Sequence, residues 1–178
     1  IESENSELVA IQKRSLKEAQ EKAKLYNIPF AFDTAEEIAK HPEIDAVFIV
    51  SPTLTHSPET IIAAKSGKHV LTEKPMAMNS KEAEEMIKIC KENNVKLMVA
   101  QMARFSPVNQ RIKTLIKENA IGKITSVRGE FFYDARFSKR TWSRDFKVSG
   151  GGPTFDIGVH CLDTLRFILE DEVVSVKS

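Results

Sequence analysis

Apolar runs alternate with helix-like segments along the first 120 residues of this 178-residue chain. The runs stand at 7–12, 30–32, 45–50, 69–72 and 96–101. Each run is nearly continuous and does not alternate with polar residues, which predicts strands covered on both faces. Such strand–helix alternation predicts an α/β fold, with a Rossmann-type doubly wound parallel sheet.

Several helix starts can be predicted from capping patterns. Ser15 and Thr34 each stand three residues before a glutamate, as in a capping box. Ser57-Pro58 indicates a cap followed by proline at the first helical position, with Gly67 as the stop. Further helices are expected at 80–93, 107–120 and 150–169.

The pattern changes after Gly122. Residues 124–137 form a longer run with several polar members, and 173–176 indicate the start of another strand. These features predict an α+β domain with an open, mainly antiparallel sheet. We therefore expect an incomplete first domain over 1–122 and the start of a second domain over 123–178.

Composition excludes several classes of protein. Apolar residues make up 42% of the chain, charged residues 29%, and the net charge is +1. This balance argues against a general nucleic-acid or membrane-surface binder. Two cysteines are too few for a disulfide scaffold. No apolar run is long enough to span a bilayer, and the first residues do not resemble a signal peptide. We expect a cytoplasmic protein without nucleic-acid or membrane partners.

In parallel α/β sheets, ligands bind beyond the carboxyl ends of the strands. The first run is followed by Lys13, Arg14 and Ser15. An acidic residue at this position would suit the ribose 2′-hydroxyl of NAD, whereas basic residues suit the 2′-phosphate of NADP. The alternative is an ordinary solvated basic turn.

The run at 45–50 is followed by Ser51, Pro52 and Thr53, and His56 stands close behind. These residues are candidates for a ligand edge. They are equally the residue types that build turns and helix starts, and nothing local separates the two interpretations.

Glu73, Lys74 and Pro75 follow the run at 69–72. A solvated lysine in a surface turn is the simple interpretation. The position favours another one, because this strand end lies on the same predicted edge as the others. Pro75 would end the strand and Lys74 would project over the edge.

The glycine run from Gly150 leads into a predicted helix in which Asp156 and His160 are four residues apart. They share one helical face, and Asp163 continues it. A carboxylate beside an imidazole suits acid–base chemistry near neutral pH. A metal site or a simple surface pair are alternatives, although no third ligand at fixed spacing is evident. The run is not a dinucleotide fingerprint, because Phe155 stands where the third glycine belongs.

Taken together, these motifs resemble the Gfo/Idh/MocA family of NAD(P)-dependent oxidoreductases. The resemblance covers the whole chain in order. It comprises "LVAI" with its following turn, "DAVFIVSPTLTH", "GKHVLTEKP", "VAQMARFSP" and "GGGPTFDIGVHCLD".

The resemblance implies roles for individual residues. Lys74, Asp156 and His160 would form the catalytic group, with His160 as proton acceptor and Asp156 orienting the substrate. Arg104 and Trp142 would join Asp156 and His160 in the substrate pocket. No metal is expected. The implied cofactor neighbours are Lys13, Arg14, Ser15, Ser51, Pro52, Thr53, His56, Glu73, Lys74 and Pro75.

Two departures from the family pattern stand out. The opening strand and its glycine-rich loop do not occur in this sequence, so a longer protein is expected. Met102 replaces the asparagine that is frequent after the last Rossmann strand. Because Lys13 occupies the position where NAD users carry an acid, NADP(H) is favoured over NAD(H).

The expected activity is hydride transfer between a nicotinamide cofactor and a sugar, cyclitol or related polyol. The resemblance also implies a homo-oligomer, either a dimer or a tetramer. Two other classes stay open at this point. One is a non-catalytic NAD(P)-binding sensor with the same fold, and the other is a metal-dependent lyase or hydrolase that uses His56, Asp156 and His160.

Overall fold

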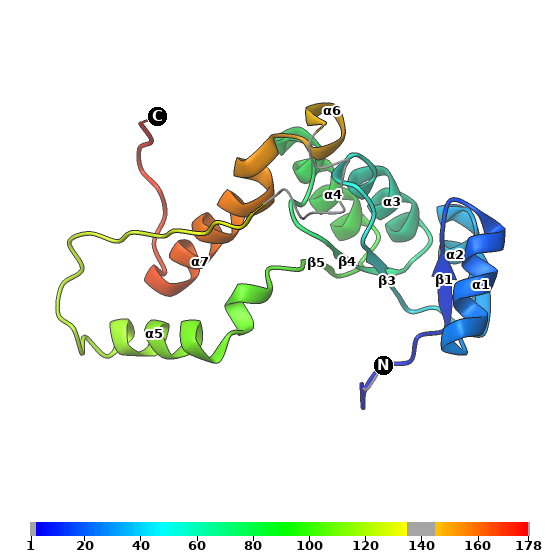
Figure 1. Ribbon diagram of the computed structural model, residues 1–178, viewed down its shortest axis with the longest axis horizontal. Helices are drawn as coiled ribbons and strands as arrows, with labels where there is room; N and C mark the ends of the chain where they lie inside the picture. The colour runs from blue at the N-terminus through cyan, green and yellow to red at the C-terminus, as the bar shows by residue number, and fades with distance from the viewer. Residues whose placement is uncertain (1–2, 135–144, 178) are drawn as a thin grey trace.

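The computed structural model describes residues 3–134 and 145–177. Figure 1 shows the arrangement of the elements. In chain order they are β1 (Ala10–Gln12), α1 (Leu16–Tyr26), β2 (Phe30–Phe32), α2 (Ala35–Lys40), β3 (Ala46–Ile49), α3 (Thr53–Lys65), β4 (His69–Thr72), α4 (Ser80–Glu92), β5 (Leu97–Val99), the 3-10 helix η1 (Met102–Phe105), α5 (Pro107–Lys117), α6 (Phe146–Ser149), the π-helical turn η4 (Thr154–Gly158) and α7 (Val159–Leu169).

The strands form two parallel sheets. β1 pairs with β2, and β3, β4 and β5 pair in that order. The alternation of strands and helices and the parallel pairing confirm the predicted Rossmann-type α/β fold. α1 and α2 accompany the first sheet, while α3 and α4 lie over the second (Figure 1).

The three-stranded sheet buries one of its two faces. Ile49 and Val70 pack against Ala63 of α3, with Val47 and Leu97 at the margin. The register places Phe48 and Met98 on the opposite face, where they are 53% and 47% exposed. The expectation that both faces are covered is therefore wrong for the described residues, because α3 and α4 pack on one side only.

Two predicted helix starts are confirmed by their caps. The Ser15 hydroxyl accepts a hydrogen bond from the Glu18 backbone N–H, and the Thr34 hydroxyl accepts one from Glu37. Each cap satisfies a backbone donor that has no partner within the helix. The stop at Gly67 is confirmed as well, by its positive φ of 76° just beyond α3.

The predicted start of α3 at Ser57-Pro58 is wrong. The helix begins at Thr53, with Pro52 as its N-cap and Pro58 inside it. A proline in the sixth helical position removes one backbone hydrogen bond. The helix is nevertheless closely packed on both sides of Pro58, since Thr53, His56, Ser57 and Thr60 are all buried.

The second part of the chain also differs from expectation. Residues 124–134 and 173–176 are not in strands, so the predicted open antiparallel sheet is not formed within the described residues; 135–137 lie outside them. A strand forms by pairing with another strand, and neither run is paired in a sheet in the part of the chain described. Val174 is 99% exposed as a result.

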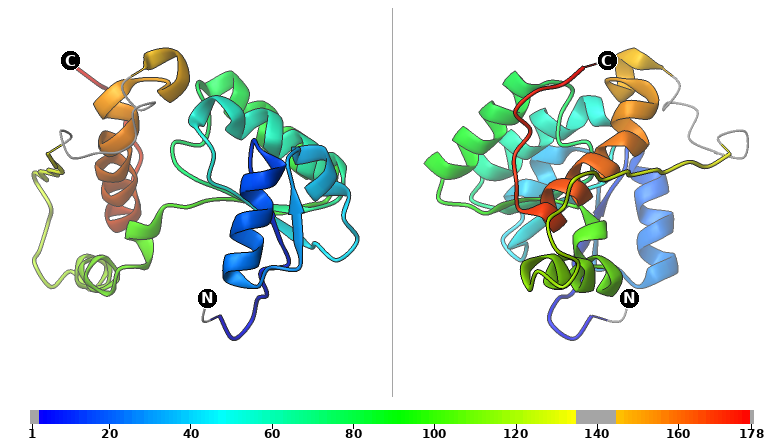
Figure 2. Two further views of the ribbon diagram at one scale, coloured as in Figure 1. Left: turned by 45° about the vertical axis from the view of Figure 1, so that its right-hand side comes forward. Right: turned by 90° about the vertical axis from the view of Figure 1, so that its left-hand side faces the viewer.

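The helices of this second part do pack. α5 packs against α7, which η1 also contacts; the left view of Figure 2 shows α5 end-on below α7. No described helix has the length and apolar character needed to cross a membrane. The domain boundary at 122–123 stays a prediction. It assigns α5 to the first domain, although α5 packs on α7 of the second.

The glycine run has steric causes. Gly150 ends α6 with φ 87°, a left-handed conformation that strains other residues. At Gly151, an added Cβ would collide with Cδ2 of Phe155 and lie 2.8 Å from Cγ of the same ring. Gly151 thus makes room for the ring at the start of η4, the turn that carries Asp156.

Replacing Gly151 by alanine should lower the free energy of unfolding by about 1–3 kcal/mol, because the Phe155 ring must move. Urea unfolding of the full-length protein measures this. Gly158→Ala is the matched control, because its Cβ would meet Thr154 at an ordinary 3.7 Å. Alanine also suits a helix better than glycine. Equal losses in the two variants would contradict the packing explanation.

Candidate functional site

The carboxyl ends of β3 and β4 lie side by side and are joined by a backbone hydrogen bond. The register pairs Ile49 with Thr72, so the turns that begin at Ser51 and Glu73 leave the same edge of the sheet. The Glu73 backbone N–H donates to the Ile49 carbonyl at 2.9 Å. This places the predicted residues of both turns next to one another.

His56 joins the two turns from below. It is 1% exposed, and its Nδ1 and Nε2 lie 2.8 Å from the Pro75 carbonyl oxygen and 2.9 Å from the Ser51 carbonyl oxygen. Both ring nitrogens are therefore engaged with backbone. The imidazole supports the turn that carries Lys74, and a metal could bind it only by breaking these contacts.

Lys74 reaches across the edge to the π-helical turn η4. Its Nζ lies 2.8 Å from Oδ1 of Asp156 and also donates to the Asp156 backbone carbonyl. The side chain of Lys74 is only 12% exposed, and that of Asp156 is 25% exposed. Partial burial strengthens such an ion pair relative to one on the surface.

Tyr133 contributes a further hydrogen bond to Asp156. Its hydroxyl donates to Oδ2 of Asp156 at 2.7 Å, so each carboxylate oxygen has its own donor. On the same extended segment, Phe131 packs on the His160 ring with centroids 5.7 Å apart. Gly129 lies against α7, where an added Cβ would stand 3.6 Å from Cβ of Cys161.

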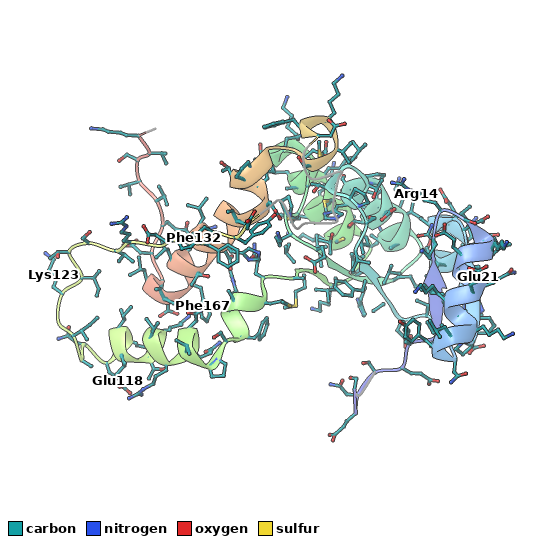
Figure 3. All side chains as sticks on the ribbon, viewed as in Figure 1. Arg14, Glu21, Glu118, Lys123, Phe132 and Phe167 are labelled. Atoms are coloured by element: carbon teal, nitrogen blue, oxygen red, sulfur yellow. The ribbon has the colours of Figure 1, made fainter. Side chains whose placement is uncertain are left out.

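Residues 129, 131 and 133 thus face the α7 side, while Phe132 between them is 83% exposed. Figure 3 labels Phe132 on this segment. The alternation is that of a strand, which the sequence predicted here. The role of Tyr133 was missed, because the pattern does not reveal which face meets the helix.

His160 stands one turn after Asp156, in the first turn of α7. Burial lowers its pKa below the ordinary value, and the nearby Lys74 ammonium lowers it further. Asp156, Glu73 and Asp163 act in the opposite direction, and the net direction of the pKa shift is downward. The neutral imidazole, which can accept a proton, is therefore favoured near neutral pH.

Arg104 pairs with Asp163 through two hydrogen bonds, 2.8 Å from Nε to Oδ2 and 2.6 Å from Nη2 to Oδ1. Its predicted contact with substrate is untested. Trp142 lies outside the described residues, and its place in the pocket stays a prediction.

The residues predicted to face the ribose of the cofactor lie in the other sheet. Lys13, Arg14 and Ser15 follow β1 in the two-stranded sheet, and Figure 3 shows Arg14 in that part of the molecule. Lys13 Nζ is 2.8 Å from Glu18 of α1, a partly exposed pair that lowers the pKa of the glutamate. Arg14 is exposed, and Ser15 caps α1.

A polar group that suits a ligand also stands at the carboxyl end of β5. The side-chain oxygen of Gln101, just after β5, is buried without a hydrogen-bond partner among the described residues. A buried acceptor of this kind is costly unless a ligand or water completes it. Over 3–134 and 145–177, no cluster of three or more histidine, cysteine, aspartate or glutamate residues could hold a metal ion.

Comparison with known proteins shows the family. Residues 1–101 match the profile of the "Oxidoreductase family, NAD-binding Rossmann fold", and residues 109–178 match the "GFO/IDH/MocA C-terminal domain". A trans-1,2-dihydrobenzene-1,2-diol dehydrogenase of Xenopus laevis is 35% identical over 93% of the chain and 49% of its own length. A scyllo-inositol 2-dehydrogenase (NADP(+)) of Bacillus subtilis is 37% identical over 89% of the chain and 49% of its own length. The chain thus spans about half the length of these relatives.

Solved structures show the same fold. Levoglucosan dehydrogenase in complex with NADH and levoglucosan has a TM-score of 0.84 at 30% identity, covering 91% of this chain and 45% of that protein. An aldose-aldose oxidoreductase from Caulobacter crescentus has a TM-score of 0.83 at 31% identity, covering 95% of this chain and 51% of that protein. With both domain profiles matched in order, this chain belongs to the Gfo/Idh/MocA family of NAD-binding oxidoreductases.

Proposed function

We propose that this chain carries the catalytic edge of an NAD(P)-dependent oxidoreductase that acts on a CH–OH group of a sugar, cyclitol or related polyol. The observation that carries the proposal is the partly buried cluster of Lys74, Asp156 and His160 at the end of β4. The related proteins named above act on a diol, an inositol or a sugar, as their names state.

Lys74 is suited to stabilise charge on the reacting oxygen. An ammonium group has three donors, and within the described residues two of them go to Asp156. The third can be donated to a substrate hydroxyl. As the carbon–hydrogen bond breaks, negative charge develops on that oxygen, and a fixed cation then stabilises the transition state.

His160 is suited to take the hydroxyl proton. The neutral ring, favoured by burial and by Lys74, accepts the proton while the carbinol becomes a carbonyl. Asp156 is held at both oxygens by Lys74 and Tyr133, which fixes the ammonium that faces the substrate. A bound nicotinamide would supply the hydride acceptor, and the chain supplies position and electrostatics.

The cofactor preference is the finer part of the proposal. Lys13 and Arg14 lie at the start of α1, where an anion is also favoured by the helix end. The exposed Lys13–Glu18 pair contributes little, so a doubly charged 2′-phosphate can displace Glu18. We therefore favour NADP(H) over NAD(H). The homo-oligomer, dimer or tetramer, and the cytoplasmic location remain predictions.

Lys74→Met should lower kcat by about 10²–10³-fold, the usual cost of one lost donor at a developing oxyanion. Cofactor affinity, measured by fluorescence titration, should change little. Lys65→Met, an exposed lysine at the end of α3, is the matched control and should leave both unchanged. An unchanged kcat in Lys74→Met would refute the assigned role, and cofactor binding without turnover in the native protein would favour the sensor.

The pH dependence should follow His160. Because its folded pKa is lowered, the base becomes protonated only below the ordinary histidine value of about 6.5. For oxidation, kcat/KM should therefore be flat near neutral pH and fall as the pH drops through a value below about 6.5. The pH profile of the full-length enzyme measures this. An acid limb above the ordinary value would contradict the assignment.

Lys13→Ala should weaken NADPH binding by about 10–100-fold, equivalent to one charge-assisted hydrogen bond, and leave NADH binding unchanged. Arg14→Ala should act in the same direction. Lys24→Ala, in the last turn of the same helix, is the control. Equal affinity of the native full-length protein for the two cofactors, or tighter binding of NADH, would sink the preference.

A further inference from the structure

Arg104 and Asp163 form a two-point ion pair between segments that lie 59 residues apart in the sequence. Arg104 belongs to η1, directly after β5, and Asp163 to α7. The fork of a guanidinium matches a carboxylate in this arrangement and fixes the relative orientation of the two groups. The Asp163 side chain is only 12% exposed, whereas that of Arg104 is 44% exposed.

Further contacts continue along the same face of α7. The Arg104 guanidinium lies 5.7 Å from the centre of the Phe167 ring, and Lys113 Nζ of α5 lies 4.3 Å from it. Lys113 also pairs with Glu170 at 2.7 Å. Figure 3 shows Phe167 where α7 faces α5. The contacted residues 163, 167 and 170 lie about one turn apart, so η1 and α5 contact one face of α7 and of the residue that caps it.

Asp163 also stands three residues after His160, on the next turn of the same helix. Among the described residues, the charged groups that act on His160 are Lys74 and Glu73 from the end of β4, Asp156 from η4, and Asp163. Lys74 already has Asp156 as its partner. Asp163 would be a partly buried, uncompensated carboxylate beside His160 without Arg104.

We propose that Arg104 is a positioning residue: its two-point pair with Asp163 holds α7 against the end of β5 and neutralises the carboxylate one turn from His160. The expected effect of this pair on turnover rests on the proposed function. Its effect on the placement and charge state of His160 does not. This role differs from the substrate contact expected from the sequence, since Nε and Nη2 of Arg104 are both used by Asp163.

The two single variants that break this pair should move His160 in opposite directions. Arg104→Gln leaves the Asp163 carboxylate uncompensated, so the His160 titration should shift to higher pH. Asp163→Asn removes that carboxylate, so the titration should shift to lower pH. Each shift should be on the order of half a pH unit, smaller than the shift caused by an opposite charge in direct contact. The double variant should titrate near the native protein.

NMR of the histidine ring in the full-length protein measures the titration without any substrate, and the acid limb of kcat/KM should shift in parallel. Glu172→Gln is the matched control, because it breaks a second two-point pair, with Arg166, at 2.9 Å and 2.6 Å on the exposed end of α7. It should leave His160 unchanged.

Shifts of both single variants in the same direction, or no shift in either, would overturn the proposal. A raised KM with unchanged titration in Arg104→Gln would return this residue to the substrate pocket. Turnover tests the proposed function, and the His160 titration tests the positioning role of Arg104. Absence of polyol turnover in the native protein contradicts the proposed function, while opposite titration shifts still support the positioning role.

Discussion

The ion pair between Lys74 and Asp156 is the interaction on which the rest of the site depends. It joins the end of β4 to a turn 82 residues later in the chain. Both side chains are largely withdrawn from water, so neither charge is tolerated well without the other. Loss of one partner would remove the link between the end of β4 and the π-helical turn, which stands one turn before His160.

The surrounding residues serve this pair from several directions. His56 supports the Lys74–Pro75 turn from beneath, and Tyr133 holds the second oxygen of Asp156. Gly151 lets Phe155 pack at the start of the π-helical turn. A π-helical turn is less regular than an α-helix and often occurs at functional sites. Here it directs the Asp156 carboxylate to Lys74 and leaves His160 on the following turn.

Much of the fold could be predicted because its determinants are local. The apolar runs and the caps at Ser15 and Thr34 depend on neighbouring residues, and both predictions are confirmed. Lys74 could be singled out because a charge and a proline at the end of a buried strand are unusual. Asp156 and His160 could be paired by helical spacing, although their catalytic roles stay predictions.

The rest depends on contacts between distant segments. The Arg104–Asp163 pair and the Tyr133 contact join residues that no local pattern relates. The start of α3 was misplaced because Pro58 suits a first turn. The helix in fact begins before Pro58, at Thr53, and both Thr53 and His56 of its first turn are buried. The run at 124–137 has strand character, but strand pairing requires a partner that the described residues do not supply.

We propose that Lys74, Asp156 and His160 promote hydride transfer from a CH–OH carbon to a bound nicotinamide. The most direct measurement is a single-turnover reaction of the full-length protein with oxidised cofactor and a panel of sugars and cyclitols deuterated at the carbinol carbon. Transfer of that deuterium to C4 of the nicotinamide from at least one compound, abolished by His160→Ala, is the predicted result. Tight cofactor binding with no transfer from any polyol would contradict the proposed hydride transfer.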